Sequence, residues 1–147
     1  MQPDADKESF VISRSHTGAV EQHIRDVYPH AKVEKAGGAG TTTINYVILF
    51  FSTFFVKYHN RGTSFDRSTG YKSLRVAGKQ VAAYMHSTNI KKWDVCPGHA
   101  IINALGGQLK TLKDEDITYH GTDPPLIEGG LLASLNTDGF YAKLSQR

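Results

Sequence analysis

Residues 93–107 read WDVCPGHAIINALGG, and this stretch is the most informative pattern in the chain. Asp94 stands before an apolar run, and the Gly106–Gly107 pair closes that run. An acidic residue at the start and glycine at the end are typical helix boundaries, so we predict a helix from Asp94 to the glycine pair. Its predicted buried side comprises Ala100, Ile101, Ala104 and Leu105.

Asp94 allows two interpretations. An aspartate at a helix start is most often a cap, which contributes about 1 kcal/mol to stability. The free N–H groups and positive dipole end of a helix start also favour a bound phosphate, and a carboxylate there can hold a hard cation such as Mg²⁺. Metal-assisted phosphoryl chemistry needs several oxygen ligands. Asp94 alone therefore predicts at most one ligand of such a site.

The rest of the chain alternates between strand patterns and helix patterns. Strands are expected at 10–13, 32–36, 81–85, 108–112, 117–120 and 130–135. Thr17 can cap a helix that presents Val20, Ile24 and Val27 and ends before Pro29, and a second helix is expected at 138–144. Because strands alternate with helices, we predict an α/β layered domain.

Composition narrows the classes of function. The 147 residues suffice for one domain, and the net charge of +3 suits an anionic small molecule. No basic run is interleaved with aromatic residues, so we expect no nucleic-acid binding. Cys96 is the only cysteine, which excludes an internal disulfide, and the polar residues 1–6 lack the apolar core of a signal peptide.

Residues 41–70 differ in composition from their surroundings. They include 13 uncharged residues, 44–56, rich in aromatic and β-branched side chains. A helix of that length spans about 20 Å, short of the roughly 30 Å bilayer core, so membrane association is not favoured.

Several weaker candidates lie where strands and helices meet. His16 follows residues 13–15 at a strand-to-helix junction, and residues 37–40 form a glycine-rich loop. Taken singly, His16, Lys72 and His86 are more often surface or packed side chains than ligand contacts, and a lone glycine cluster is weak evidence of a site.

Together these motifs resemble the inositol monophosphatase superfamily. The Trp-Asp pair, the apolar helix and the glycine pair of residues 93–107 are similar to its signature. Ser-Arg-Ser-His at 13–16 and Gly-Gly-Ala-Gly at 37–40 with Tyr-Lys at 71–72 resemble its bisphosphate nucleotidase branch. Residues 90–94 and 128–134 look closest to the Golgi-resident member of that branch. The resemblance implies the C-terminal part of the family's layered α/β sandwich, with residues 1–147 as a single partial domain, and a Golgi location.

The resemblance also implies roles for individual residues. Ser13 and His16 would contact a nucleotide, and Gly38 would let the backbone approach it. Lys72 would pair with a phosphate, and His86 falls where relatives place a polar nucleotide contact.

The implied reaction is Mg²⁺-dependent removal of the 3'-phosphate from 3'-phosphoadenosine 5'-phosphate, which leaves adenosine monophosphate. Asp94 would be a ligand of the metal ion. The implied partner is thus a small phosphate substrate, an adenosine bisphosphate or an inositol phosphate.

Two departures from the family pattern limit this expectation. The family's glutamate pair and its Asp-Pro-Leu-Asp-Gly-Thr motif are not in these 147 residues, and Asp123-Pro124-Pro125-Leu126 lacks the second aspartate and Gly-Thr. We therefore expect little or no phosphatase activity from this chain alone. In addition, residues 41–70 separate two motifs that are adjacent in relatives, which suggests a foreign insert such as a retained intron.

Two alternative functions stay open. The chain can belong to an inositol monophosphate phosphatase, because the Trp-Asp and Gly-Gly pattern is shared. It can also be a non-catalytic nucleotide-binding or interaction fragment. A sheet face left apolar and uncovered would favour a homo-oligomer.

Overall fold

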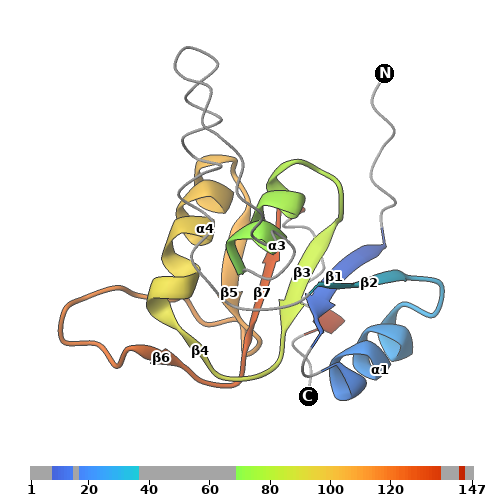
Figure 1. Ribbon diagram of the computed structural model, residues 1–147, viewed down its shortest axis with the longest axis horizontal. Helices are drawn as coiled ribbons and strands as arrows, with labels where there is room; N and C mark the ends of the chain where they lie inside the picture. The colour runs from blue at the N-terminus through green and yellow to red at the C-terminus, as the bar shows by residue number, and fades with distance from the viewer. Residues whose placement is uncertain (1–7, 15–16, 37–68, 137–142, 145–147) are drawn as a thin grey trace, which may run out of the picture.

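The computed structural model describes residues 8–14, 17–36, 69–136 and 143–144. At its centre is a mixed five-stranded sheet with the strand order β2-β1-β3-β7-β5 (Figure 1). The strands are β1 (Ser9–Ser13), β2 (Lys32–Ala36), β3 (Ala83–His86), β5 (Gln108–Thr111) and β7 (Leu131–Ser134). Strands β2, β1 and β3 are parallel, and β7 runs antiparallel to both β3 and β5. The predicted α/β layered architecture is confirmed.

Helices cover the sheet on both sides. Helix α1 (Gly18–Val27) lies on one face, and α3 (Thr69–Ala77) and α4 (Lys92–Ala104) lie side by side on the other (Figure 1). A separate two-stranded ladder joins β4 (Ile90–Lys91) to β6 (Leu126–Ile127) at the start of α4. Within the described residues, none of the helices has the length and apolar character that crossing a bilayer requires.

The two-residue period of the strands divides their side chains between two cores. On β1, Phe10 and Ile12 are fully buried in the cluster that includes Ile24 of α1. Val11 lies between them in sequence and joins the cluster under α3 and α4. On β3, Tyr84 belongs to that same cluster. The sheet therefore separates a core under α1 from a core under α3 and α4.

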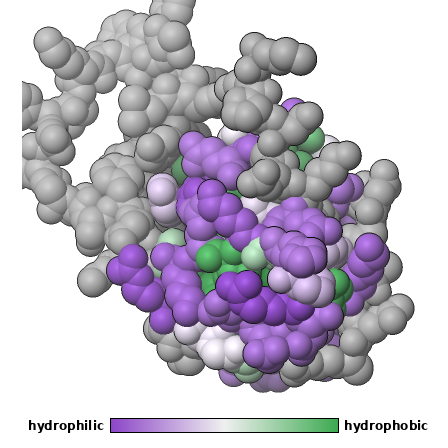
Figure 2. All heavy atoms as spheres, turned by 90° about the vertical axis from the view of Figure 1, so that its right-hand side faces the viewer, coloured by the Kyte–Doolittle hydropathy of each residue, from purple (hydrophilic) through white to green (hydrophobic). Residues whose placement is uncertain are grey.

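The surface over α1 and β2 is mostly hydrophilic (Figure 2). Glu21 of α1 pairs with Lys35 at 2.8 Å and with Arg25 at 3.0 Å. Hydrogen bonds from Lys35 and then Arg25 lower the pKa of the Glu21 carboxyl. Such exposed pairs contribute little stability, so the apolar residues beneath α1 hold this face of the molecule together.

The structure corrects the expected position and orientation of α4. The helix starts at Lys92, and Asp94 lies in its first turn. Its buried residues are Val95, Gly98 and Ile102, whereas Ala100, Ala104 and Leu105, predicted to be buried, are exposed and Ile101 is only half-buried. The apolar residues of this helix are spread around its circumference, so periodicity could not identify the buried side.

The strand predicted at 117–120 is not formed. Ile117 is buried, but the hydroxyl of Thr118 and the backbone N–H of His120 donate to the Asp123 carboxylate, which holds this segment as a loop. The strand predicted at 81–85 is shifted to Ala83–His86, because the Ala82 N–H is taken by Ser9 before regular pairing begins.

Three elements of the structure were not expected from the sequence. Helix α3 was not predicted, and neither were β4 and β6, which have two residues each. An element of two residues shows no periodicity. The helix predicted at 138–144 falls outside the described residues except for 143–144, and so do residues 41–68 of the predicted insert.

Candidate functional site

The carboxyl ends of three parallel strands meet at one edge of the sheet. Ser13 ends β1, Ala36 ends β2 and His86 ends β3. The pairs Ser13–Ala36 and Ile12–Met85 set this register and bring Ser13 and His86 to the ends of neighbouring strands. Ligands of open α/β sheets bind beyond the carboxyl ends of their strands. Both side chains are buried, with 7% of Ser13 and 9% of His86 exposed.

Lys72 lies in the first half of α3 and contacts β3, two residues before His86. Only 1% of its surface is exposed, and its Nζ atom is 5.3 Å from the centre of the Tyr84 ring. Burial lowers the pKa of Lys72 to about 8, because removal from water disfavours the charged form. A lysine buried to this degree is unusual and needs partners for its charge.

His86 continues this polar arrangement to the end of β3. Its Nε2 atom lies 3.0 Å from Thr88 Oγ1, and its ring is 6.4 Å from that of Tyr84. Tyr84 and His86 are two residues apart on one strand, so they share a face of the sheet. We call Lys72, Tyr84 and His86 the buried row. Tyr84 was not singled out from the sequence. Its position two residues before His86 on an expected strand nevertheless indicates that both side chains point to the same side of the sheet.

A close backbone contact fixes the end of β3. Gly130, next to β7, has a φ of +91°, and a Cβ atom there would overlap the carbonyl oxygen of His86 and lie 2.7 Å from Ser87 Cα. The adjacent Gly129 N–H donates to Asn89 Oδ1 at 3.2 Å. Only glycine accommodates both the backbone angle and the contact at position 130, so this contact holds His86 in place.

Asp94 approaches the same region from α4. Helices α3 and α4 cross where Ser73, next to Lys72, meets Gly98, whose added Cβ would lie 2.6 Å from Ser73 Oγ. Asp94 lies one turn before Gly98 and is half-buried. In the part of the chain that the structure describes, its carboxylate takes part in no hydrogen bond or ion pair. Its oxygens are therefore available as ligands.

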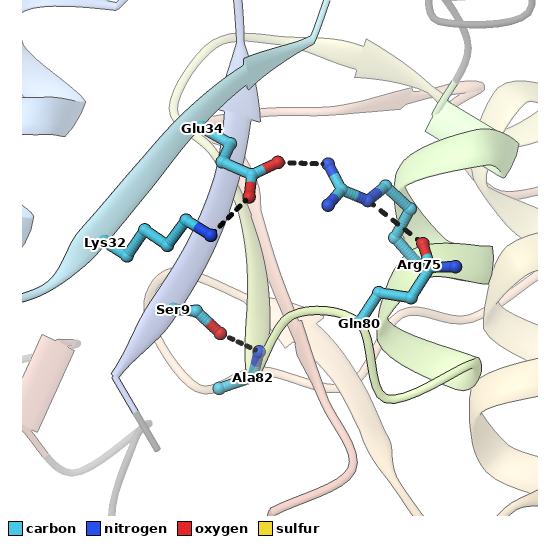
Figure 3. A network of polar contacts seen from close by, with 6 residues as sticks. All are labelled: Ser9, Lys32, Glu34, Arg75, Gln80 and Ala82. Carbon is cyan, nitrogen blue, oxygen red and sulfur yellow. Dashed lines mark hydrogen bonds and ion pairs between the residues drawn. The ribbon is translucent and has the colours of Figure 1, made fainter. Parts of the chain in front are cut away.

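A polar network links α3 to β2, the outermost strand on this side of the sheet (Figure 3). Arg75 of α3 donates from Nη1 to Glu34 Oε2 on β2 at 2.5 Å, and from Nε to Gln80 Oε1 at 3.3 Å. Lys32 lies 3.5 Å from the other oxygen of Glu34. The hydrogen bond from Arg75 is the main reason that the pKa of Glu34 is lowered. The network thus connects the helix that carries Lys72 to β2.

Asp123 has a structural role. Its carboxylate accepts hydrogen bonds from Thr118 and from the His120 N–H and lies 3.4 Å from Lys92 Nζ at the start of α4. These partners lower its pKa, with Thr118 as the main cause. A carboxylate used in this way holds the loop against α4.

The structure brings together some of the predicted site residues. Ser13 and His86 end neighbouring parallel strands, Lys72 lies over Tyr84 on the same strand as His86, and Asp94 lies in the first turn of α4. His16 and Gly38 lie outside the described residues. Among the residues described, no group of three or more His, Cys, Asp or Glu side chains is placed to hold a metal ion.

The sequence profile described as "Inositol monophosphatase family" matches residues 11–147. Inositol monophosphatase 3 of Xenopus tropicalis is 37% identical over 144 residues, which cover 95% of this chain and 33% of that protein. The Golgi-resident adenosine 3',5'-bisphosphate 3'-phosphatase of Homo sapiens is 39% identical over 127 residues, or 86% of this chain and 28% of that protein. The chain spans about a third of the length of these relatives.

A solved structure shares the fold. The crystal structure of inositol monophosphatase-II from Staphylococcus aureus MSSA476 superposes with a TM-score of 0.55 at 14% identity. The match covers 97% of this chain and 41% of that one. At this identity the likeness concerns the arrangement of strands and helices.

Proposed function

We propose, from the premise that this chain belongs to the inositol monophosphatase family, that it forms the substrate-phosphate part of a metal-dependent phosphatase. The proposed reaction removes the 3'-phosphate of 3'-phosphoadenosine 5'-phosphate and leaves adenosine monophosphate. The observation that supports this proposal is a buried lysine over Tyr84 of the parallel strand β3, together with a carboxylate, Asp94, in the first turn of α4 that has no partner among the described residues.

Each residue has a separate task in this proposal. Lys72 supplies a positive charge for a phosphate, and because it is buried, little water competes for that charge. Ser13 and His86 offer polar groups at the ends of neighbouring strands. His16 and Gly38, outside the described residues, are proposed to contact the nucleotide as well.

Asp94 is proposed to supply one oxygen ligand to Mg²⁺. Its carboxylate fits this role because it has no partner among the residues that the structure describes, and carboxylate oxygens are preferred ligands of Mg²⁺. Bound Mg²⁺ would supply charge stabilisation and an activated water for phosphate ester hydrolysis. The described residues offer no group of three such ligands, so we propose that this chain binds substrate but hydrolyses it poorly by itself.

Calorimetry on the 147-residue chain tests this proposal. We expect 3'-phosphoadenosine 5'-phosphate to bind in the presence of Mg²⁺, with affinity reduced about 10- to 100-fold in Lys72→Met, because a charge-assisted contact contributes about 1.5–3 kcal/mol. Lys91→Met is the matched control, since Lys91 also lies 5.3 Å from an aromatic ring, Trp93, but is exposed. Equal binding by all three proteins would refute the proposal.

A second candidate is an inositol monophosphate phosphatase, which the name of the Xenopus relative favours. Titration of the same chain with inositol 1-phosphate separates the two. Tighter binding of inositol 1-phosphate than of the nucleotide would favour this alternative. Measurable binding with no turnover on addition of Mg²⁺, in the 147-residue chain and in the whole protein alike, would favour the non-catalytic alternative.

Two further predictions belong to this proposal. A Golgi location is proposed because the human relative is Golgi-resident, and a tagged form of the whole protein found outside the Golgi would contradict it. That residues 41–70 are an insert stays a prediction. Sequencing of transcripts across this region tests it, and messages that mostly retain the segment would count against it.

A further inference from the structure

Tyr84 is the middle member of the buried row, and neither the motifs nor the proposed reaction gives it a role. Its side chain is fully buried. The Lys72 Nζ lies over its ring at 5.3 Å from the ring centre, and the His86 ring lies 6.4 Å away along the same face. Tyr84 thus connects a residue of α3 with the end of β3.

The strand register makes Tyr84 a fixed platform. Tyr84 lies opposite Val11 of β1 and Ala133 of β7, so backbone pairing restrains it on both sides. Val76, one turn after Lys72 on α3, packs in the same core cluster. A ring held in this way has little freedom to move when a ligand binds.

The ammonium of Lys72 needs such a platform. Removing a charged group from water is costly unless nearby groups stabilise the charge. The face of an aromatic ring attracts a cation, and this attraction is larger in a desolvated setting than at the surface. The Tyr84 ring therefore opposes the cost of burying Lys72 and also restricts where its ammonium can lie.

We propose that Tyr84 is a positioning residue that holds the Lys72 ammonium at the carboxyl ends of the parallel strands, where a substrate phosphate is to be bound. This inference rests on the proposed function for the identity of the ligand. It concerns the ring of Tyr84, so phenylalanine is expected to replace it and leucine is not.

Two variants and one matched control test the role of the ring in the 147-residue chain. Tyr84→Phe keeps the aromatic face, and Tyr84→Leu removes it. Phe10→Leu makes a similar change at a fully buried aromatic position in the core under α1, away from Lys72. Thermal unfolding of all three reports the general cost of losing core volume.

The first readout needs no ligand. In NMR spectra of the unaltered chain, the ε-methylene protons of Lys72 are expected to be shifted upfield by the ring current of Tyr84. This shift should persist in Tyr84→Phe and in Phe10→Leu and disappear in Tyr84→Leu. Lys72 ε-methylene protons at their ordinary position in the unaltered chain would overturn the inference, even if Tyr84→Leu does not fold.

The second readout is affinity for 3'-phosphoadenosine 5'-phosphate. Tyr84→Leu should bind about 10-fold more weakly, equivalent to about 1.4 kcal/mol, whereas Tyr84→Phe and Phe10→Leu stay within about 3-fold of the unaltered chain. A folded Tyr84→Leu with unchanged affinity contradicts the inference. If the unaltered chain binds no nucleotide, the proposed function fails, and the ring-current shift still decides whether Tyr84 holds Lys72.

Discussion

The two faces of the same strands differ in chemistry. Toward α1, strand β3 presents Ala83 and Met85, and both are buried in an apolar cluster. Toward α3, the alternate residues of that strand are Tyr84, whose ring lies under the Lys72 ammonium, and His86, whose ring lies 6.4 Å from that of Tyr84. Since the backbone is common to both faces, the difference lies in the side chains alone. One face is specialised for stability, and the other accepts buried polar groups.

The α3 face carries a cost that the α1 face avoids. Ser13, Lys72, Ser73 and His86 are all buried on or beside it. The Ser73 hydroxyl makes no hydrogen bond within the described residues. Buried polar groups that are incompletely satisfied reduce stability. Of these four residues, Ser13, Lys72 and His86 are the ones that the sequence motifs single out.

The largest expected effect comes from placing a lysine on the apolar face. Met85→Lys puts an ammonium one residue after Tyr84 on β3, but among the apolar side chains under α1, where Met85 is 2% exposed. We expect a loss of about 4 kcal/mol or more in the free energy of unfolding, because the charge has no partner there. Urea denaturation measures the loss. A loss below about 1 kcal/mol would mean that the two faces are equivalent.

The next effect concerns the contact at the end of β3. Gly130→Ala should cost more than about 3 kcal/mol, because its Cβ meets the backbone of His86 and Ser87 at a positive φ. Gly129→Ala is the control. Gly129 also has a positive φ, +74°, but an added Cβ would meet nothing within 4 Å, so its cost is limited to about 1–2 kcal/mol of backbone strain. Equal losses in urea denaturation would contradict the close contact.

A smaller effect, opposite in sign, is expected from Lys72→Met. The pKa of Lys72 is about 8 in the folded chain, below its ordinary value of 10.5. Between these values the unfolded chain binds more protons, so stability rises as the pH increases from about 8 to about 10.5. Lys72→Met should remove this rise and be more stable at pH 7 by about 1–3 kcal/mol.

Chemical denaturation between pH 7 and pH 10.5 measures this dependence. Lys91→Met, which alters an exposed lysine, should leave the free energy of unfolding within about 0.5 kcal/mol at each pH. A Lys72→Met variant that is less stable at pH 7 than the unaltered chain would show that the lysine is a structural residue.

The sequence predicted the fold well where elements are long and regular. Helix α1 buries Val20 and Ile24 as its 3.6-residue period predicts, and β2 spans the expected residues 32–36. Helix α4 was located, but the prediction of its buried side was wrong, because its apolar residues are spread around the whole circumference of the helix. The segment 117–120 resembled a strand, and the hydrogen bonds of Asp123 hold it as a loop.

The candidate site was predictable only in part, because it depends on contacts between distant residues. Motifs indicated Ser13, Lys72, His86 and Asp94, but no local pattern shows that Lys72 is buried against a tyrosine twelve residues away. Tyr84 was recognised only as part of an apolar strand. The contact between Tyr84 of β3 and Lys72 of α3 depends on how the helix packs on the sheet, and a local sequence pattern does not report such packing.

The central claim is that ligand binding belongs to the α3 face at the carboxyl ends of the parallel strands. The most direct test is to follow backbone and methyl NMR resonances of the 147-residue chain while adding 3'-phosphoadenosine 5'-phosphate and Mg²⁺. We predict the largest shifts at Ser13, Lys72, His86 and Asp94, with little change at Val20 and Ile24 in the core under α1. Shifts concentrated at α1, or none at these four residues, would contradict the claim.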